Sequence, residues 1–307
     1  MASAALLGLT NFNSPLLRNI VPCAATSFAI QYAVGLPSTF LAKPPTERYY
    51  DLSGAITNVA VVALSLLLPR WRAAEAGGDL GPPNWHQIAL SGAVAIWAAR
   101  LGTYLFRRIL REGKDSRFDA MRVKPARMMI AWTAQAVWVI MCQLPVMAVN
   151  TVSPAIAYYP SYILPSDTLG LGLFAFGLAF ESLADWQKAT WVAARDAKEH
   201  DEVFISSGLF GQCQYPHYFG EMTLWTGLAI AAAGVLTRAP VQASLGGIST
   251  LSALALAFAS PAFTIYVLVR VSGIQLSQRK YDRKYYGRRK DYSEWRDKTP
   301  LLIPRFT

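Results

Sequence analysis

The sequence predicts an all-α fold, a multi-pass transmembrane bundle of about seven helices with the N-terminus outside and the C-terminus in the cytosol. Of its 307 residues, 53% are hydrophobic and only 16% are charged, and the mean hydropathy is +0.26. Soluble domains carry about 25% charged residues. The deficit indicates that much of the surface faces lipid, because so few charges cannot cover a water-exposed surface of this size.

Seven apolar stretches approach the roughly 20 residues that a helix needs to cross a bilayer. Their approximate limits are 19–42, 50–69, 85–106, 128–149, 164–187, 218–236 and 245–269. The second and seventh are the cleanest, whereas Pro22, Gly35 and Pro37 interrupt the first. Because no hydrophilic run is long enough for a separate soluble domain, residues 1–307 are predicted to form a single membrane domain.

The positions of the cations explain the formal net charge of +10. Of the 29 Lys and Arg residues, 24 lie in the loops after the first, third and fifth spans and in the tail after the seventh. The positive-inside rule places this side in the cytosol. A basic chain can also bind nucleic acid, but cations distributed in this way indicate membrane orientation and contact with lipid headgroups. Nucleic-acid binding is therefore not expected.

The sequence offers neither a disulfide framework nor a metal site. The usual ligand spacings cannot be assembled from its three cysteines and three histidines. These residues are Cys23, Cys142, Cys213, His86, His200 and His217.

Charged side chains inside the predicted spans include Arg100, Glu181 and Asp185. Each costs about 2.5–3.5 kcal/mol on insertion scales, so each is a candidate functional residue. Glu181 and Asp185 are four residues apart, which places both carboxylates on one face of a helix. That face can hold a ligand, or it can form an internal ion pair with Arg100 or Lys188, and the sequence leaves both interpretations open.

The segment 206–227, SSGLFGQCQYPHYFGEMTLWTG, combines glycines with hydrogen-bonding side chains. His217 can donate or accept a hydrogen bond. Glu221 stands in the first turn of an apolar helix, where only a polar pocket or a ligand makes it tolerable. A re-entrant loop that lines a cavity fits this pattern. An interfacial turn fits the same composition, with Tyr215, Tyr218 and Phe219 in an aromatic belt.

Several motifs between residue 85 and the C-terminus occur together. They are Asp185 followed by Gln187, GLF at 208–210, PHYFGE at 216–221, Arg270 with Gly273, and Tyr292, Thr299 and Ile303–Pro304 in the tail. This set resembles the C-terminal domain of the steroid 5-alpha-reductase (3-oxo-5-alpha-steroid 4-dehydrogenase) family, in its uncharacterised multi-pass branch. The resemblance covers residues 85–307 and implies a seven-helix membrane oxidoreductase. Such an enzyme takes NADPH from the cytosolic side and reduces an activated C=C bond in a lipid-soluble substrate.

The resemblance also assigns residues to an NADPH site. The family's cofactor-binding Asp falls on Asp185, the polar residue one turn earlier on Glu181, and the Glu of the FGE motif on Glu221. His217 replaces the Asn that precedes YFGE, and Tyr218 belongs to the same segment. Arg195 and Arg270 are among the cations expected to face the phosphates.

The sequence departs from the family pattern in three places. The usual RYSRHPN reads GQCQYPH over residues 211–217, which changes most of the loop's polar side chains. The catalytic Tyr expected three residues before Arg100 is Trp97, so Tyr104, one turn beyond Arg100, is the candidate proton donor, although a place in the aromatic belt fits it as well. The partner Glu expected in the second span is missing, and only Asp51 stands at its start. A sterol-, isoprenoid- or lipid-like substrate is therefore predicted rather than a steroid specifically.

Two other functions stay open. Membrane methyltransferases that modify prenylated cysteine with S-adenosylmethionine have an RHPxYxG-like segment, and YPHYFG is about as close to it as to PNYFG. The altered loop also fits a non-catalytic membrane protein with a degenerate site. The tail YSEWRDKTPLLIP favours the reductase. The chain is predicted to be integral to a lipid bilayer, which is the endoplasmic reticulum membrane if the protein is eukaryotic, and its oligomeric state is left open.

Overall fold

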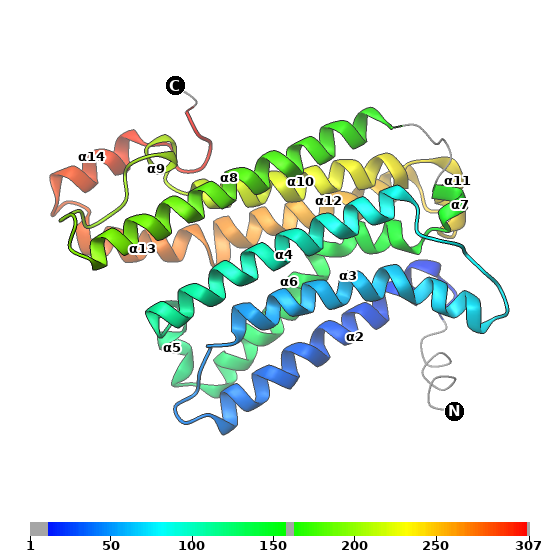
Figure 1. Ribbon diagram of the computed structural model, residues 1–307, viewed down its shortest axis with the longest axis horizontal. Coiled ribbons are helices and arrows are strands. Elements are labelled where there is room, and N and C mark those ends of the chain that lie inside the picture. Colours follow the sequence, from blue (N-terminus) through cyan, green and yellow to red (C-terminus); the bar gives the residue numbers. More distant parts are fainter. Residues whose placement is uncertain (1–11, 158–162, 306–307) are drawn as a thin grey trace. The chain divides into compact units, whose positions relative to one another are not determined.

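The computed structural model describes residues 12–157 and 163–305, and over these ranges it is helical with no strand (Figure 1). Seven helices are long and apolar enough to cross a membrane, which confirms the predicted all-α, multi-pass fold. They cover α2 with η1 (Pro15–Leu36 and Pro37–Leu41), α3 (Tyr50–Glu75), α4 (Trp85–Glu112), α6 (Pro125–Thr151), α8 (Pro165–Asp196), α10 (Pro216–Leu236), and α12 (Thr250–Tyr266) with its continuation. That continuation is η3 (Val267–Val271) and α13 (Ile274–Tyr285).

Short helices connect these spans. They are η2 (Ser116–Phe118), α5 (Asp119–Arg122), α7 (Pro154–Ala157), α9 (Leu209–Gln212) and α11 (Ala239–Ser244), and α14 (Lys290–Lys298) follows α13. The Pro-interrupted first span is a helix despite Pro22, because a bundle can satisfy the backbone groups that a proline leaves.

Several helices extend beyond the predicted spans. α4 continues to Glu112, with a left-handed cap at Gly113 (φ 75°), and α8 continues to Asp196, because charged side chains do not stop a helix that leaves the bilayer. Tyr104 therefore lies two turns inside α4 rather than near its end. α12 begins later than predicted, since Gly246 and Gly247 adopt positive φ in the turn before it.

The chain divides into two compact units. The first contains residues 1–169 and 228–260, and the second contains residues 170–227 and 261–307. Helices α8, α10 and α12 each contribute residues to both units. The single membrane domain over residues 1–307 stays a prediction.

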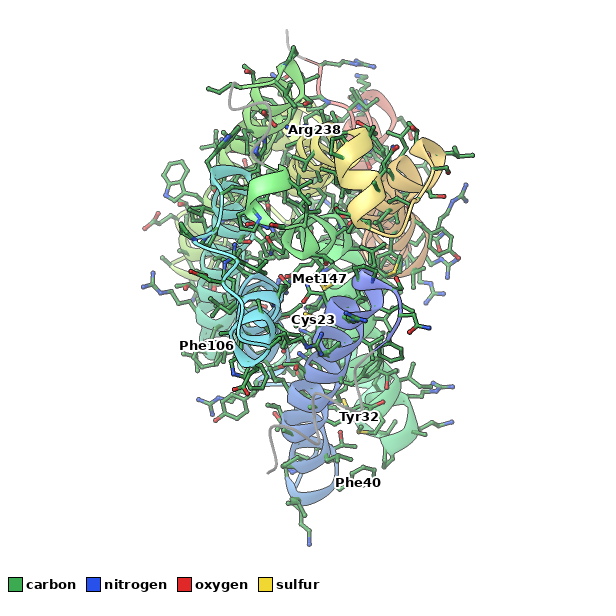
Figure 2. All side chains as sticks on the ribbon, turned by 90° about the vertical axis from the view of Figure 1, so that its right-hand side faces the viewer. Cys23, Tyr32, Phe40, Phe106, Met147 and Arg238 are labelled. Carbon is green, nitrogen blue, oxygen red and sulfur yellow. The ribbon has the colours of Figure 1, made fainter. Side chains whose placement is uncertain are left out.

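Helices α2, α3, α4 and α6 form the core of the first unit. Cys23, Val61, Val139 and Met147 make one fully buried apolar cluster, and Figure 2 shows Cys23 and Met147 facing each other inside this bundle. Because lipid is as apolar as such a core, burial alone does not hold membrane helices together.

Buried amides and hydroxyls join these four helices. The Gln31 amide donates to Thr57 Oγ1 at 2.7 Å, which ties α2 to α3. The Asn150 amide donates to Ser65 Oγ and Ser91 Oγ at 2.9 and 3.0 Å, which joins α6 to α3 and α4. Interhelical hydrogen bonds of this kind add roughly 0.6–2 kcal/mol each in a membrane.

An ion cluster closes the end of the first unit where α3 begins and α4 ends. Arg122 donates to both carboxylate oxygens of Glu47 at 2.6 Å, and the backbone N–H of Asp115 donates to Glu47 at 2.7 Å. Arg108 bridges Asp51 and Asp115 at 3.4 and 3.0 Å. The loops 42–49 and 113–124 are thereby fixed to each other.

Candidate functional site

Two buried carboxylates stand on α8 in the second unit. Glu181 is 2% exposed and Asp185 is 8% exposed, although both belong to a candidate membrane span. They are one helical turn apart, so they share a face as the sequence predicts. A buried carboxylate offers only hydrogen-bond acceptors when ionised, so this face requires donors or cations around it.

Glycines bring α10 into backbone contact with this part of α8. A Cβ atom on Gly220 would lie 2.7 Å from the backbone N of Glu181, and one on Gly227 would lie 2.4 Å from the backbone O of Gly170. A Cβ on Gly177 would lie 2.6 Å from the backbone O of Gly220. These are distances that real Cβ atoms do not adopt, so only glycine permits this approach.

The glycine contact brings a third buried carboxylate to the same helix pair. Glu221 follows Gly220 directly and is 9% exposed. The rings of Phe180 and Phe219, which precede the two contacting residues, meet edge to face at 5.3 Å. The structure thus brings Glu181, Asp185 and Glu221 to one helix pair of the second unit.

Aromatic rings flank the start of α10. The His217 and Tyr218 rings lie 4.1 Å apart, and Tyr218 stacks on Tyr215 at 5.8 Å with an interplanar angle of 16°. A Cβ on Gly273 would lie 3.1 Å from the Tyr218 ring, so the turn after η3 packs against the same ring. His217 and Tyr218 therefore belong to one surface with the turn that follows Arg270.

The altered loop GQCQYPH is held by the C-terminal tail. The backbone N–H of Gln214 donates to Pro300 O at 2.9 Å, and its side-chain amide donates to Arg296 O and Thr299 O at 3.0 and 2.7 Å. Trp295 Nε1 donates to Phe210 O at 3.1 Å. Gln214 thus satisfies carbonyl groups where α14 ends, which helix ends otherwise leave without partners.

Other loop residues are also structural. Cys213 is fully buried, and burial raises the pKa of its thiol to about 12, so it stays protonated at neutral pH and is not a nucleophile. Burial likewise raises the pKa of the Tyr215 phenol. At two of the loop's departures from the family pattern, Cys213 is thus buried and Gln214 binds the tail, whereas His217 faces the rings of Tyr218 and Phe210.

Gln187 anchors the other end of the loop. Its side-chain oxygen accepts the backbone N–H of Leu209 at 2.9 Å. Gly208 precedes Leu209 with φ of 58°, and a Cβ there would lie 2.6 Å from the Gln187 side chain. The two residues of the Asp185-x-Gln187 pattern therefore have different roles: Asp185 is a buried carboxylate, and Gln187 binds the loop that follows the helix.

The two predicted phosphate-binding arginines differ in their surroundings. Arg195 lies near the end of α8, about 15 Å along the helix from Asp185. It pairs with Asp196 at 2.8 Å and covers the Trp191 ring at 5.5 Å, so it is not brought to the carboxylates. Arg270 is exposed in η3, three residues before Gly273. Tyr104, the candidate proton donor, is partly buried on α4 in the first unit.

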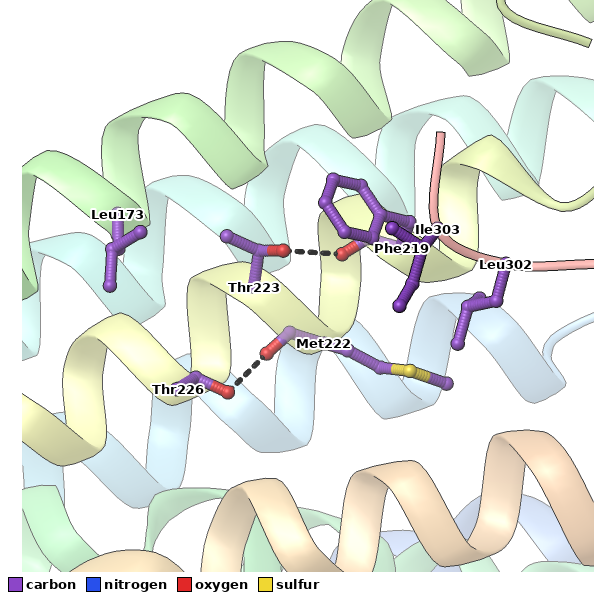
Figure 3. Close-up of a pocket in the computed structure, with 7 residues that line it drawn as sticks. All are labelled: Leu173, Phe219, Met222, Thr223, Thr226, Leu302 and Ile303. Carbon is purple, nitrogen blue, oxygen red and sulfur yellow. Dashed lines mark hydrogen bonds between the residues drawn. The ribbon is translucent and has the colours of Figure 1, made fainter. Parts of the chain in front are cut away.

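A small groove lies on another face of α10. It encloses about 240 Å³ between Leu173, four residues of α10 and the tail residues Leu302 and Ile303 (Figure 3). Figure 3 also shows that the hydroxyls of Thr223 and Thr226 donate to helix carbonyls, both at 2.7 Å. The groove residues on α10 are spaced by three and four, and Glu221 points about 160° away from Phe219. This apolar groove is distinct from the carboxylate face.

The sequence identified the buried carboxylates of the site, but not the glycines and the glutamine that hold its helices and loop in place. The glycines that permit the contact are spaced by seven on both helices, Gly170 and Gly177 on α8 and Gly220 and Gly227 on α10. This spacing puts small residues on one stripe and was a readable signal. No comparable signal identified Gln214, because its partners come from the tail about 85 residues later. Among the described residues, no group of three or more His, Cys, Asp or Glu could hold a metal ion.

Comparison with known proteins identifies a family. A family model described as "Protein of unknown function (DUF1295)" matches residues 47–299. No curated protein matches the chain, and no solved structure does. Since the match covers most of the chain, including the α8–α10 pair and α14, the protein belongs to the DUF1295 family of proteins of unknown function.

Proposed function

We propose that this protein is an NADPH-dependent membrane reductase that acts on an activated C=C bond of a lipid-soluble substrate. The observation that supports the proposal most is the burial of Glu181, Asp185 and Glu221 on two helices in backbone contact. Buried acids in a membrane span are costly and are retained where a function requires them. The resemblance of the same segments to steroid 5-alpha-reductases supplies the reaction class.

The residues of the second unit fit the hydrogen-bonding groups of NADPH. Ribose hydroxyls and the carboxamide NH₂ are donors, and carboxylates are acceptors without donors of their own. Three acids would repel phosphates, so the phosphates belong on the side of Arg270, beyond the Tyr218 ring. In this assignment Glu181, Asp185, Glu221 and His217 hold the nicotinamide-riboside half. Arg195, already paired with Asp196, contributes less than Arg270.

The chemistry divides between cofactor and protein. Bound NADPH supplies a hydride for the electron-poor carbon of an enone. The protein must then hold a proton near the carbonyl oxygen, where negative charge develops, and protonation of the carbon next to the carbonyl gives the saturated ketone. The resemblance implies the phenol of Tyr104 as that donor. The buried acids orient the cofactor and exclude water from it.

Ligand stabilisation in detergent tests this function. NADPH is expected to raise the Tm of the purified protein, and Glu221→Gln and Asp185→Asn are expected to reduce this shift to half or less. Glu199→Gln changes an exposed acid outside the spans and serves as the control. Tyr104→Phe is expected to keep the NADPH shift and to lose reduction of enone lipids.

The S-adenosylmethionine-dependent methyltransferase is the second candidate, and one observation favours it. Three buried carboxylates would also suit the sulfonium and ammonium charges of S-adenosylmethionine, which carries no phosphate. The thermal-shift experiment separates the two functions when NADPH, NADH and S-adenosylmethionine are compared. Stabilisation by S-adenosylmethionine alone would replace the reductase proposal.

We further propose an orientation, a substrate class and a cellular location for the protein. The C-terminus is placed in the cytosol, where NADPH is available to the second unit. The substrate is sterol-, isoprenoid- or lipid-like and is taken from the bilayer. In a eukaryotic cell, the endoplasmic reticulum membrane is the expected location.

A further inference from the structure

An apolar groove of about 400 Å³ runs between α3 and α4 in the first unit, where the two helices lie side by side (Figure 1). Five residues of α3 between Leu52 and Ala60 and three residues of α4 between Ala99 and Thr103 line it. The hydroxyl of Thr103 donates to Ala99 O at 2.7 Å. The lining therefore offers no polar group in need of a partner, which suits a hydrocarbon chain.

Small side chains create the groove. A Cβ on Gly102 would lie 2.3 Å from the Ala55 Cβ, so the helices touch at this point, and the other alanines leave space beside it. The groove opens sideways between Ile56, which is 53% exposed, and Val59, which is 39% exposed. Because α3 and α4 are both candidate membrane spans, the open side meets the hydrocarbon of the bilayer.

Two stacked rings lie about one turn beyond the groove, at the end where α3 begins. Tyr49, the N-cap residue of α3, stacks on Phe106 of α4 at 6.4 Å with an interplanar angle of 27°. Phe106 is one turn beyond Gly102. Tyrosine at such a position is typical of the boundary between hydrocarbon and headgroups.

Two uncompensated cations adjoin these rings. Arg48 precedes Tyr49 and Arg107 follows Phe106, and both are exposed. Within residues 12–157 and 163–305, neither guanidinium has a carboxylate within 4 Å, whereas the Arg108 and Arg122 charges are taken up by Asp115 and Glu47. Of these four arginines, Arg108 and Arg122 thus hold the loops together, whereas Arg48 and Arg107 are neighbours of the two stacked rings.

We propose that the α3–α4 groove binds one acyl chain of an anionic phospholipid, with the phosphate of its headgroup at Arg48 and Arg107. Guanidinium groups match phosphate geometry, and each basic residue near an anionic surface adds to lipid affinity. The apolar lining accepts the chain, and the stacked Tyr49 and Phe106 rings mark the depth of the ester region. This lipid site does not depend on the proposed reductase activity.

Photo-crosslinking from the acyl chain tests the site in the full-length protein. The protein is placed in nanodiscs of phosphatidylcholine with a trace of a probe lipid, which is either phosphatidylglycerol or phosphatidylcholine. Both probes carry the same diazirine acyl chain, and the labelled peptides are identified by mass spectrometry. Label from phosphatidylglycerol is expected within residues 52–60 and 99–103, in excess over phosphatidylcholine by about 5-fold per arginine. Equal labelling by the two lipids would mean ordinary bilayer contact and would overturn the proposal.

The headgroup half is tested by a double variant. Arg48→Gln with Arg107→Gln is expected to reduce phosphatidylglycerol labelling to the phosphatidylcholine level. Arg111→Gln, one turn beyond Arg107 and paired with Glu112, is the matched control and is expected to keep the preference. A preference that survives the double variant would place the headgroup elsewhere and refute the assignment.

The acyl half is tested by filling the groove. Ala99→Phe is expected to remove most of the label, whereas Ile96→Phe, exposed on the same helix but outside the lining, is expected to retain it. Ala60→Leu fills the groove from α3 and replaces Ala99→Phe if that variant does not fold. Unchanged labelling in a folded groove-filling variant contradicts the proposal.

Discussion

Glu221 and Asp185 carry the strongest prediction at the scale of single residues. Glu221→Gln and Asp185→Asn keep the shape of each side chain and remove its charge. Because hydrogen bonds to charged groups contribute about 1.5–3 kcal/mol, each variant should weaken NADPH binding about 10- to 100-fold. Titration of purified protein with NADPH, followed by nicotinamide fluorescence, measures the change.

The matched control for these variants is Glu199→Gln, which alters an exposed acid in the loop after α8. It should bind NADPH with unchanged affinity. If all three variants bind equally well, the buried acids have only a structural role.

Gly220 is predicted to be indispensable for the contact between α8 and α10. A Cβ there would lie 2.7 Å from backbone atoms of Gly177 and Glu181, so Gly220→Ala should cost about 1–3 kcal/mol through overpacking. Gly172→Ala is the control on α8, because a methyl group at this position would meet nothing within 4 Å, and it should be neutral or stabilising by up to about 1 kcal/mol. Unfolding in detergent measures both, and equal stability of the two variants would exclude the close contact.

The candidate site residues could be predicted from the sequence where a charged residue lies in an apolar stretch. Glu181, Asp185 and Glu221 are conspicuous in this way, and the structure buries all three. The role of Gln214 was not predictable, because its side chain acts on carbonyl groups of Arg296 and Thr299 that become neighbours only after folding. The family motif shows only that Gln214 differs from the usual residue, and it does not indicate what this side chain binds.

At the scale of elements, the loop 208–215 and α14 are predicted to be stabilised together. Gln214→Leu removes two hydrogen bonds to carbonyl groups at the end of α14 and should expose this helix to solvent exchange. The expected cost is about 1–3 kcal/mol, because carbonyl groups lose their partners. Hydrogen–deuterium exchange over residues 290–300 should rise relative to Lys290→Ala, whose parent side chain is 92% exposed. Unchanged exchange in Gln214→Leu would show that the loop 208–215 does not stabilise α14.

The cluster around Glu47 makes the loop pair 42–49 and 113–124 sensitive to acid. Burial favours a raised pKa for Glu47, but hydrogen bonds from Arg122 and from the Asp115 N–H outweigh it and lower the pKa below its ordinary value of 4.5. Burial also opposes ionisation of Asp115, and hydrogen bonds from Arg117 again lower the pKa below the ordinary 3.8. A lowered folded-state pKa means that this stabilisation is complete above the ordinary values and is lost as pH falls through the folded ones.

Thermal unfolding at pH 7 and at decreasing pH below 4.5 should therefore show a steeper loss of stability than in Arg122→Gln. That variant should also lose about 2 kcal/mol at pH 7, because a charged hydrogen-bond partner is removed. The same acid sensitivity in both proteins would show that Glu47 is not the responsible group.

The sequence predicted the presence of each membrane helix correctly, but it placed several helix ends at the wrong residues. All seven predicted spans are present, because about 20 apolar residues have few alternatives to a membrane helix. The ends of α4 and α8 were placed too early, since charges mark the edge of the bilayer and not the end of hydrogen bonding along the helix. The late start of α12 follows from the positive φ of Gly246 and Gly247, which their sequence pair could have indicated.

At the scale of the whole molecule, the cation distribution predicts the orientation. With 24 of 29 Lys and Arg residues on one side, the loops after the first, third and fifth spans and the tail should face the cytosol. In a variant without the three native cysteines, Arg289→Cys and Gly78→Cys are introduced separately. Each variant is then treated with a membrane-impermeant maleimide in intact cells. Only the site at Gly78 should react, and labelling at Arg289 instead would invert the topology.

The division into two units was not evident from composition, because α8, α10 and α12 each contribute to both. Apolar patterning detects spans but does not say which spans pack together, since lipid and protein interiors are equally apolar. The pattern that does report packing is the placement of small and polar residues. In the second unit it is the glycine stripe of α8 and α10, and in the first it is the row of buried amides that includes Gln31 and Asn150.

The central claim, that the second unit holds NADPH, is tested most directly by ligand stabilisation of the purified protein. At about 100-fold excess over Kd, a ligand that binds only the folded state adds about 2.7 kcal/mol. We predict that NADPH raises the Tm, that NADH and S-adenosylmethionine raise it less, and that Glu221→Gln reduces the stabilisation by NADPH to about 0.4–1.4 kcal/mol. A shift with S-adenosylmethionine and none with NADPH would contradict the account.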